Sequence, residues 1–200
     1  MAAISDASTT ESHSFALNWS AAEIERLTSA ARKLASDAAA KYAAQRFPSV
    51  PSGAQRTPPS QRSRTRSSPG TAHAQLEDVK VKLFDVDFDN NPEIVLTARE
   101  SLPVPGGGTR TLYLALAARD EQGSALYPLL SYITDEQRLD ALPRLEFIDA
   151  VDADGDGVAE FLFRSIGVAD ENGNLSRGFQ LYHTGPDRLR KVFDSSGPAD

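Results

Sequence analysis

The chain has 200 residues, a formal net charge of −7 and a hydrophobic fraction of 40%, which allows one ordinary domain with extensions or two small domains. It contains no cysteine, which excludes a disulfide framework, and no apolar run is long enough for a membrane span. Residues 1–75 carry nine Lys and Arg against five Asp and Glu, whereas residues 76–200 carry twelve against twenty-three. We therefore expect two parts that do not share a core, the acidic one lacking the positive surface that phosphate binding needs.

The first predicted element is an amphipathic, Ala-rich helix over residues 18–47, preceded by a disordered N-terminus, residues 1–17. Ser20 and Glu23 have the spacing of a capping box, which marks the helix start. A narrow apolar stripe follows at intervals of three or four residues: Ile24, Leu27, Ala31, Leu34, Ala38 and Tyr42. Because alanine dominates the stripe, two interpretations stay open: a helix docked on a partner helix or on the acidic part, or a solvated helix.

Residues 48–75 contain five prolines and almost no large apolar side chains, so they predict a disordered linker. Four arginines in this segment give an alternative role as a tether to nucleic acid or to an anionic surface: Arg56, Arg62, Arg64 and Arg66. No aromatic residue interleaves with them, so stacking on single-stranded bases is not expected and nucleic acid is a disfavoured partner.

From residue 76 onward the apolar pattern has a period of two. Eight short strands are predicted, at residues 79–84, 94–97, 111–116, 126–133, 145–148, 161–163, 179–182 and 189–193. Pro128 places its strand at an edge or at a bulge, and residues 135–139 are expected to add one helical turn. The sequence thus predicts a mainly β domain over residues 76–200, built as two propeller-blade-like units or as a small antiparallel sandwich.

One stretch, residues 152–160, has the spacing of a cation site, with acidic residues at positions 1, 3, 5 and 9 and glycine at position 6. A hard cation such as Ca²⁺ takes six to eight oxygen ligands, here predicted from Asp152, Asp154, Asp156, the Val158 carbonyl and Glu160. Position 12, where a helical calcium hand carries its last acidic ligand, is Phe163 in an apolar run. The pattern therefore predicts a strand–loop–strand site.

This loop resembles the calcium loops of the FG-GAP and VCBS repeats in β-propellers, such as integrin α-chains and many bacterial envelope proteins. The resemblance implies the same five ligands and Ca²⁺ as the cofactor. That family usually ends its loop in aspartate where this chain has Glu160, and a full propeller needs more blades than the two that this chain offers. Residues 76–200 also resemble the C-terminal regions of an uncharacterised acidobacterial protein family.

A second copy of the spacing lies upstream at residues 85–93, with Asp85, Asp87, Asp89 and Glu93 as candidate ligands. Asn90 stands where the later loop has glycine, and asparagine tolerates left-handed backbone better than most residues. The two loops begin 67 residues apart and each precedes an apolar strand, which indicates an internal duplication. The alternative is that both are ordinary hairpin turns in which aspartates form Asx turns.

These features predict a non-enzymatic, calcium-stabilised β module with a structural or interaction role, facing an unknown protein or glycan partner. Extracellular calcium modules have dissociation constants of about 10⁻⁴–10⁻³ M, so the loops favour the bacterial cell envelope or the outside of the cell. The N-terminus shows no signal peptide, and an upstream export segment would reconcile the two observations.

No reaction is predicted from the sequence. The histidines are His13, His73 and His183, too scattered for a zinc cluster or a catalytic triad, and His183 is expected to be a surface residue. Two further alternatives stay open beside the tether: a carbohydrate-active hydrolase with opposed carboxylates outside the loops, and a fragment of a larger repeat protein.

Overall fold

The computed structural model describes residues 19–47, 76–103, 107–121, 123 and 125–195. The predicted N-terminal segment 1–17 and the predicted linker 48–75 with its four arginines lie outside these residues, so the tether alternative stays a prediction.

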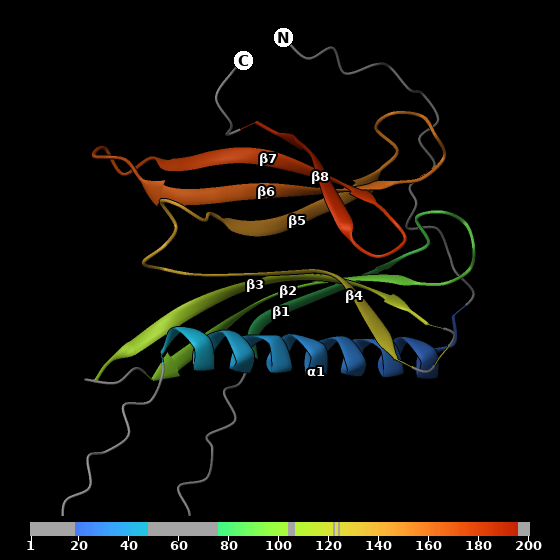
Figure 1. Ribbon diagram of the computed structural model, residues 1–200, viewed down its shortest axis with the longest axis horizontal. Coiled ribbons are helices and arrows are strands. Elements are labelled where there is room, and N and C mark those ends of the chain that lie inside the picture. Colours follow the sequence, from blue (N-terminus) through green and yellow to red (C-terminus); the bar gives the residue numbers. More distant parts are fainter. Residues whose placement is uncertain (1–18, 48–75, 104–106, 122, 124, 196–200) are drawn as a thin grey trace, which may run out of the picture.

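The protein is mainly β, as predicted, and has three layers (Figure 1). Sheet A consists of four antiparallel strands, β1 (Leu76–Phe84), β2 (Glu93–Pro103), β3 (Thr109–Asp120) and β4 (Leu126–Asp135). Sheet B consists of β5 (Arg144–Val151), β6 (Glu160–Ala169), β7 (Leu175–Thr184) and β8 (Leu189–Asp194). All eight predicted strands are present, and each sheet is a meander whose spatial order is its chain order.

The two sheets repeat one structural unit. An acidic loop joins the first two strands of each sheet, and a bulge interrupts the pairing of the last two. The bulge falls between Ala117 and Ala118 on β3 and between Leu181 and Tyr182 on β7. A shared strand order, loop position and bulge position mean that residues of one sheet can be assigned equivalents in the other.

Aromatic rings fill the core between the sheets. Phe84 of sheet A packs against Phe147 and Phe161 of sheet B, with ring centroids 5.3 and 5.8 Å apart. Phe163 continues the cluster and lies 5.6 Å from Tyr182. Tilted and edge-on rings at these distances add specific attraction to the burial of their apolar surface, so this cluster holds the two sheets face to face.

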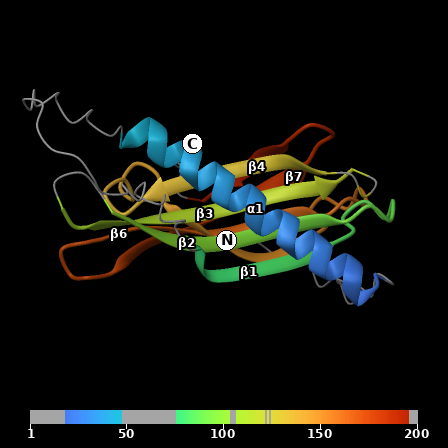
Figure 2. The ribbon, with the colours of Figure 1, turned by 90° about the horizontal axis from the view of Figure 1, so that it is seen from below.

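The opposite face of sheet A is covered by α1 (Ala21–Arg46), which crosses the strands diagonally (Figure 2). The capping box predicted at its start is present: the Ser20 hydroxyl accepts from the Glu23 amide at 3.2 Å, and the Glu23 carboxylate accepts from the Ser20 amide at 2.8 Å. The helix is docked rather than solvated, which decides between the two interpretations. The expectation that residues 1–75 and residues 76–200 share no core was wrong, because α1 packs in one apolar cluster with sheet A. The charge of residues 1–75 was counted over the helix and the linker together, which hid the apolar side of the helix.

The buried line of α1 also differs from the predicted stripe. It consists of Leu27, Ala31, Ala35 and Ala39, spaced four residues apart, whereas Ile24 is 42% exposed. Small side chains along this line allow the helix backbone to lie close to the sheet. Two polar contacts fix its ends, a two-pronged ion pair from Arg26 to Asp120 at 2.8 and 3.2 Å and a hydrogen bond from Tyr42 to Asp135 at 2.9 Å.

Pro128 lies both on an edge strand, β4, and beside a bulge, so its missing N–H costs no ladder hydrogen bond. Asp135 ends β4, and residues 136–139 form turns and a bend instead of the expected helical turn. The Asp135 carboxylate accepts from the Gln137 amide at 3.0 Å, and this Asx-type contact favours a turn over a helix. Among the described residues, no helix has the length and apolarity that a membrane crossing requires.

Candidate metal sites

The two acidic loops occupy equivalent places. The first acidic loop, residues 85–93, joins β1 to β2, and the second, residues 152–160, joins β5 to β6. Both lie at the same end of the molecule (Figure 1), where the amide of Ala159 donates to the carbonyl of Val86 at 2.8 Å. This hydrogen bond ties the second loop directly to the first, so the conformations of the two loops are coupled.

Three hydrogen bonds recur at the same positions of both loops: position 6 to position 1, position 7 to position 5, and position 2 to position 9. In the first loop the amides of Asn90, Asn91 and Val86 donate to the carboxylates of Asp85, Asp89 and Glu93 at 3.2, 2.7 and 3.2 Å. In the second loop the amides of Gly157, Val158 and Ala153 donate to Asp152, Asp156 and Glu160 at 3.1, 2.8 and 2.9 Å. The nine-residue spacing therefore specifies one loop conformation.

The backbone agrees with this equivalence. Positions 4 and 6 have positive φ in both loops, at Phe88 (58°) and Asn90 (63°) in the first and at Gly155 (81°) and Gly157 (89°) in the second. Only glycine adopts this region freely, and other residues pay about 1–2 kcal/mol. The first loop thus adopts its conformation despite a less suitable sequence.

The carboxylates converge in both loops. In the first loop, oxygens of Asp85, Asp87 and Glu93 lie within 4.8 Å of one another. In the second, ligand atoms of Asp152, Asp154 and Asp156 form one such group, and those of Asp154, Glu160 and His183 form another. Of the predicted acidic ligands, Asp89 alone belongs to no such group among the described residues. Its two oxygens instead accept from the backbone amide and the side-chain amide of Asn91 at 2.7 and 2.8 Å.

Burial distinguishes the first loop from an ordinary Asx turn. Asp85 is 6% exposed and Glu93 is fully buried. One oxygen of Asp85 and one of Asp87 are buried without a hydrogen-bond partner among the described residues. A buried, unsatisfied carboxylate oxygen is costly, and coordination of a cation is one way in which proteins satisfy it.

Each position-9 glutamate has a basic partner that the sequence did not predict. Arg119 donates through Nε to Glu93 at 2.8 Å and also lies 4.0 Å from Asp87. At the equivalent place in sheet B, the Nδ1 atom of His183 lies 2.8 Å from Glu160. His183 is thus joined to the second loop and is not simply a surface residue. Arg119 and His183 are each the penultimate residue of the third strand of their sheet, a signal visible only after the strands are paired.

The first loop has perturbed acidities. Burial raises the pKa of Glu93 to about 7 although hydrogen bonds from Arg119 and Val86 oppose the shift. Burial and the neighbouring charge of Asp89 raise the pKa of Asp87. Burial acts in the same direction on Asp89, but hydrogen bonds from Asn91 outweigh it and lower the pKa of Asp89. The raised pKa values of Glu93 and Asp87 mean that, without a further cation, the ionised form of these two carboxyls is disfavoured.

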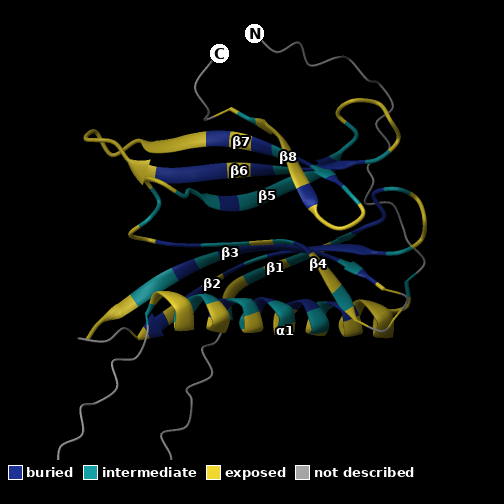
Figure 3. Cartoon of the chain, viewed as in Figure 1, coloured by how far each residue is buried: buried dark blue, intermediate teal, exposed yellow. Residues whose placement is uncertain are grey.

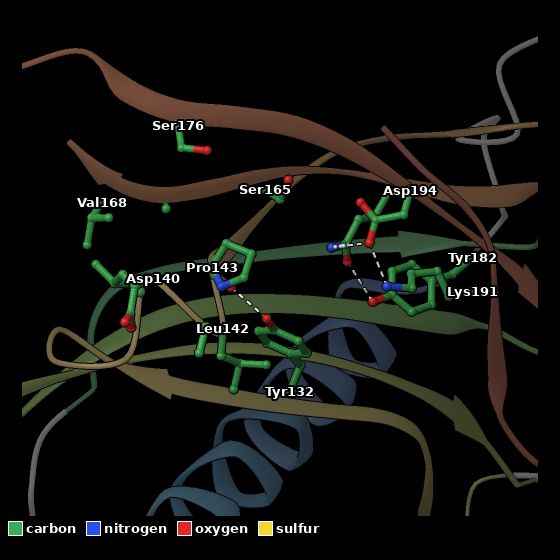
Figure 4. A pocket seen from close by; sticks show the side chains of 14 residues that line it. Tyr132, Asp140, Leu142, Pro143, Ser165, Val168, Ser176, Tyr182, Lys191 and Asp194 are labelled. Atoms are coloured by element: carbon green, nitrogen blue, oxygen red, sulfur yellow. Dashed lines mark hydrogen bonds and ion pairs between the residues drawn. The ribbon is translucent and has the colours of Figure 1, made fainter. Parts of the chain in front are cut away.

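A polar crevice of about 450 Å³ lies away from the loops, between the β4–β5 connection and the inner face of β6–β8 (Figure 4). Asp140 and Asp194 lie on different walls of it. The carboxylate of Asp194 accepts from Lys191 at 2.6 Å and from Gln180 at 3.1 Å. Burial raises the pKa of Tyr182 to about 12, so this phenol stays neutral. The hydrolase alternative, which needs opposed carboxylates outside the loops, would use Asp140 and Asp194 of this crevice, and it stays a prediction.

Comparisons with known protein families, with curated proteins and with solved structures gave no match to this chain.

Proposed function

We propose that this protein is a non-enzymatic β module whose two acidic loops bind Ca²⁺, and that the bound metal staples the loop-bearing ends of the two sheets together. The observation that carries the proposal is the pair of buried, unpartnered oxygens on Asp85 and Asp87 beside the buried Glu93. The recurrence of the same hydrogen-bonded loop conformation in the second sheet supports it independently.

In the second loop the ligands are Asp152, Asp154, Asp156, the Val158 carbonyl and Glu160. In the first loop they are Asp85, Asp87 and Glu93, and Asp89 joins them only by releasing Asn91. An all-oxygen set of carboxylates with a backbone carbonyl suits Ca²⁺ in its variable coordination number better than Zn²⁺, which prefers nitrogen and sulfur.

The cell envelope or extracellular space is the location that fits this chemistry, since metal sites of the millimolar class fill there. Metal binding would neutralise the loops and hold fixed the sheet surfaces between them. The role is therefore structural or one of interaction with a protein or glycan, consistent with the resemblance of the loops to FG-GAP and VCBS repeats.

Calorimetric titration with Ca²⁺ and thermal melts in Ca²⁺ and in EDTA test the proposal. We expect binding to be lost from the second loop in Asp154→Ala and from the first in Asp85→Asn. Asp170→Asn is the matched control, because Asp170 caps the β6–β7 turn by accepting from the amides of Asn172 and Asn174 at 2.9 and 2.8 Å, outside both acidic loops. Identical melting curves in Ca²⁺ and EDTA, with no heat of binding, would overturn the proposal.

A further inference from the structure

The duplication assigns residues on one face of sheet A equivalents in sheet B where the two sheets share a pairing register. Glu93 and Glu160 begin β2 and β6, and Ala117 and Leu181 precede the matching bulges, which fixes the register. On β2, β3 and β4, apolar residues of this face of sheet A include Val95, Ala115, Ala117, Leu129 and Leu130. Their equivalents in sheet B are, in the same order, Leu162, Phe179, Leu181, Val192 and Phe193.

In sheet A this face is covered. Val95, Ala115, Ala117 and Leu129 are between 0% and 4% exposed and belong to the core that sheet B completes. Sheet A therefore shows what this surface does when a partner is present: it packs against the face of another antiparallel sheet.

In sheet B the equivalent face, which we call the open face, points away from sheet A and no described residue covers it (Figure 3). Phe179, Val192 and Phe193 are 47%, 47% and 53% exposed, and Leu162 and Leu181 are half-buried. Exposed aromatic and aliphatic side chains gathered on one flat sheet mark an interaction surface, whereas single exposed apolar residues do not.

We propose that the open face is a dimer interface that takes the open face of a second copy of this chain. The inner face of sheet B is occupied by sheet A, and the back of sheet A is occupied by α1 through Leu27 and three alanines. Head-to-tail stacking of sheets would require a free back face, and none is present in the described part of the chain. The sheet face that a second copy can offer is thus the same one, which makes the contact two-fold and closed.

The size of the side chains on the open face supports a second copy as the partner. The covered face of sheet A carries Ala115 and Ala117, which leave room for the rings of sheet B, whereas the open face carries Phe179 and Leu181 at those positions. An identical unit stacked in the manner of sheet B on sheet A would collide with these larger side chains. Two open faces meeting across a two-fold axis instead place protruding rings of one copy between those of the other.

The size and charge of the open face suit a modest, stable interface. Its longest strands have ten residues, so four strands present a surface of roughly 30 by 15 Å. Its flat area of roughly 450 Å² is a little more than half of the ~800 Å² that each partner buries in a standard interface, which suits a modest contact. Glu146 and Arg164 are cross-strand neighbours, and the residue opposite Arg164 on β7 is Phe179, so the face carries both signs of charge beside its apolar patch.

Sedimentation and light scattering of the full chain test the inference. We expect the wild type to be a dimer. Phe193→Glu and Val192→Glu should each raise the dimer dissociation constant at least tenfold, so that these variants sediment as monomers. Ile24→Glu is the matched control, an equally exposed apolar residue on α1 that should leave the dimer intact. Retained near-ultraviolet circular dichroism would show that the variants are folded. A wild type that stays monomeric up to about 100 μM, above the dissociation constants of stable dimers, would overturn the proposal.

Because the chain has no cysteine, a single introduced one reports the contact without background. Leu181→Cys, at the centre of the open face, should form a disulfide-linked dimer under mild oxidation, and Ser29→Cys on the exposed side of α1 should not. A dimer that forms equally through both cysteines, or one unaffected by Phe193→Glu, contradicts the two-fold contact. A monomeric Leu181→Cys variant whose introduced thiol resists a thiol reagent shows that the chain covers this face itself, and also overturns the proposal.

Discussion

The two acidic loops have one backbone conformation but neutralise their charge in different ways. In the first loop Arg119 contacts both Glu93 and Asp87, and the pKa values of these two carboxyls are raised. In the second loop Asp154 and Asp156 are exposed, Asp152 is half-buried, and the basic partner of Glu160 is the imidazole of His183. The first loop therefore contains a guanidinium as part of its own counter-charge, whereas the second has an imidazole at the equivalent place.

This difference shows that the suitability of a sequence for the loop conformation and the need of its carboxylates for a counter-charge are separate properties. Glycines make the second loop easy to form, so under the proposed function we expect it to fold without metal and to gain stability on metal binding. The first loop has two buried carboxylates, Asp85 and Glu93, and Arg119 supplies a counter-charge to Glu93. We infer that Ca²⁺ binds the second loop more tightly, because no guanidinium competes there.

The largest effect is expected from removing the internal cation of the first loop. At pH 8 in EDTA, Arg119→Met should lower the free energy of unfolding by about 3 kcal/mol, because it leaves the buried Glu93 and the half-buried Asp87 without a positive partner. His183→Gln should cost no more than about 1 kcal/mol. Chemical denaturation measures both. The control is Arg99→Met, which breaks an exposed ion pair with Asp78 and should change stability by less than about 0.5 kcal/mol. Equal losses in Arg119→Met and His183→Gln would remove the proposed contrast.

Calcium should act mainly through the second loop. At a Ca²⁺ concentration about 100 times the dissociation constant, linkage gives about 2.7 kcal/mol of stabilisation, or roughly 5–10 °C in melting temperature. We expect Asp154→Ala, in the second loop, to abolish most of this shift in melting temperature. Asp87→Ala, in the first loop, should abolish a smaller part of it. Scanning calorimetry with and without Ca²⁺ measures the shifts. If Asp87→Ala loses more of the calcium-induced shift than Asp154→Ala does, the inferred order of affinity is wrong.

The raised pKa of Glu93 in the first loop predicts a pH dependence of stability. Folding raises the pKa of Glu93 from 4.5 to about 7, so the folded state binds more protons than the unfolded state between these pH values. In EDTA the free energy of unfolding should therefore fall as pH rises from about 4.5 to 7, by roughly 2–3 kcal/mol. Glu93→Gln, which is neutral throughout, should lack this slope. Denaturation curves at several pH values check it, and a rise in stability over this range would contradict the assignment.

The strands were predictable because each carries its own signal. Alternating side chains with turn residues at both ends specify a strand locally, and all eight follow from this pattern. The acidic spacing likewise defined both loops, since three of their hydrogen bonds join residues no more than seven positions apart. Strands and loops, whose conformation depends on residues close together in the chain, could therefore be predicted from the sequence.

The features that could not be predicted from the sequence depend mostly on contacts between segments that are distant in the chain. Arg119 lies 26 residues from Glu93 and His183 lies 23 from Glu160, so neither contact has a local signal. The docking of α1 was left open because an alanine stripe is weakly apolar, although its small size is what permits close packing. Asp89 satisfied the spacing yet belongs to no carboxylate group among the described residues, because Asn91 offers its oxygens two nearer donors.

The smallest predicted effects exchange the turn residues of the two loops. Phe88 adopts positive φ, as does Gly155 at the equivalent position, and nothing lies within 4 Å of a Cβ added to Gly155. Phe88→Gly should therefore stabilise the protein, and Gly155→Ala should destabilise it, each by about 1 kcal/mol in EDTA. Since the steric surroundings of Gly155 are open, its change isolates the cost of the backbone conformation. Equilibrium denaturation measures both, and the same sign for both changes would mean that the two loops do not share one conformation in solution.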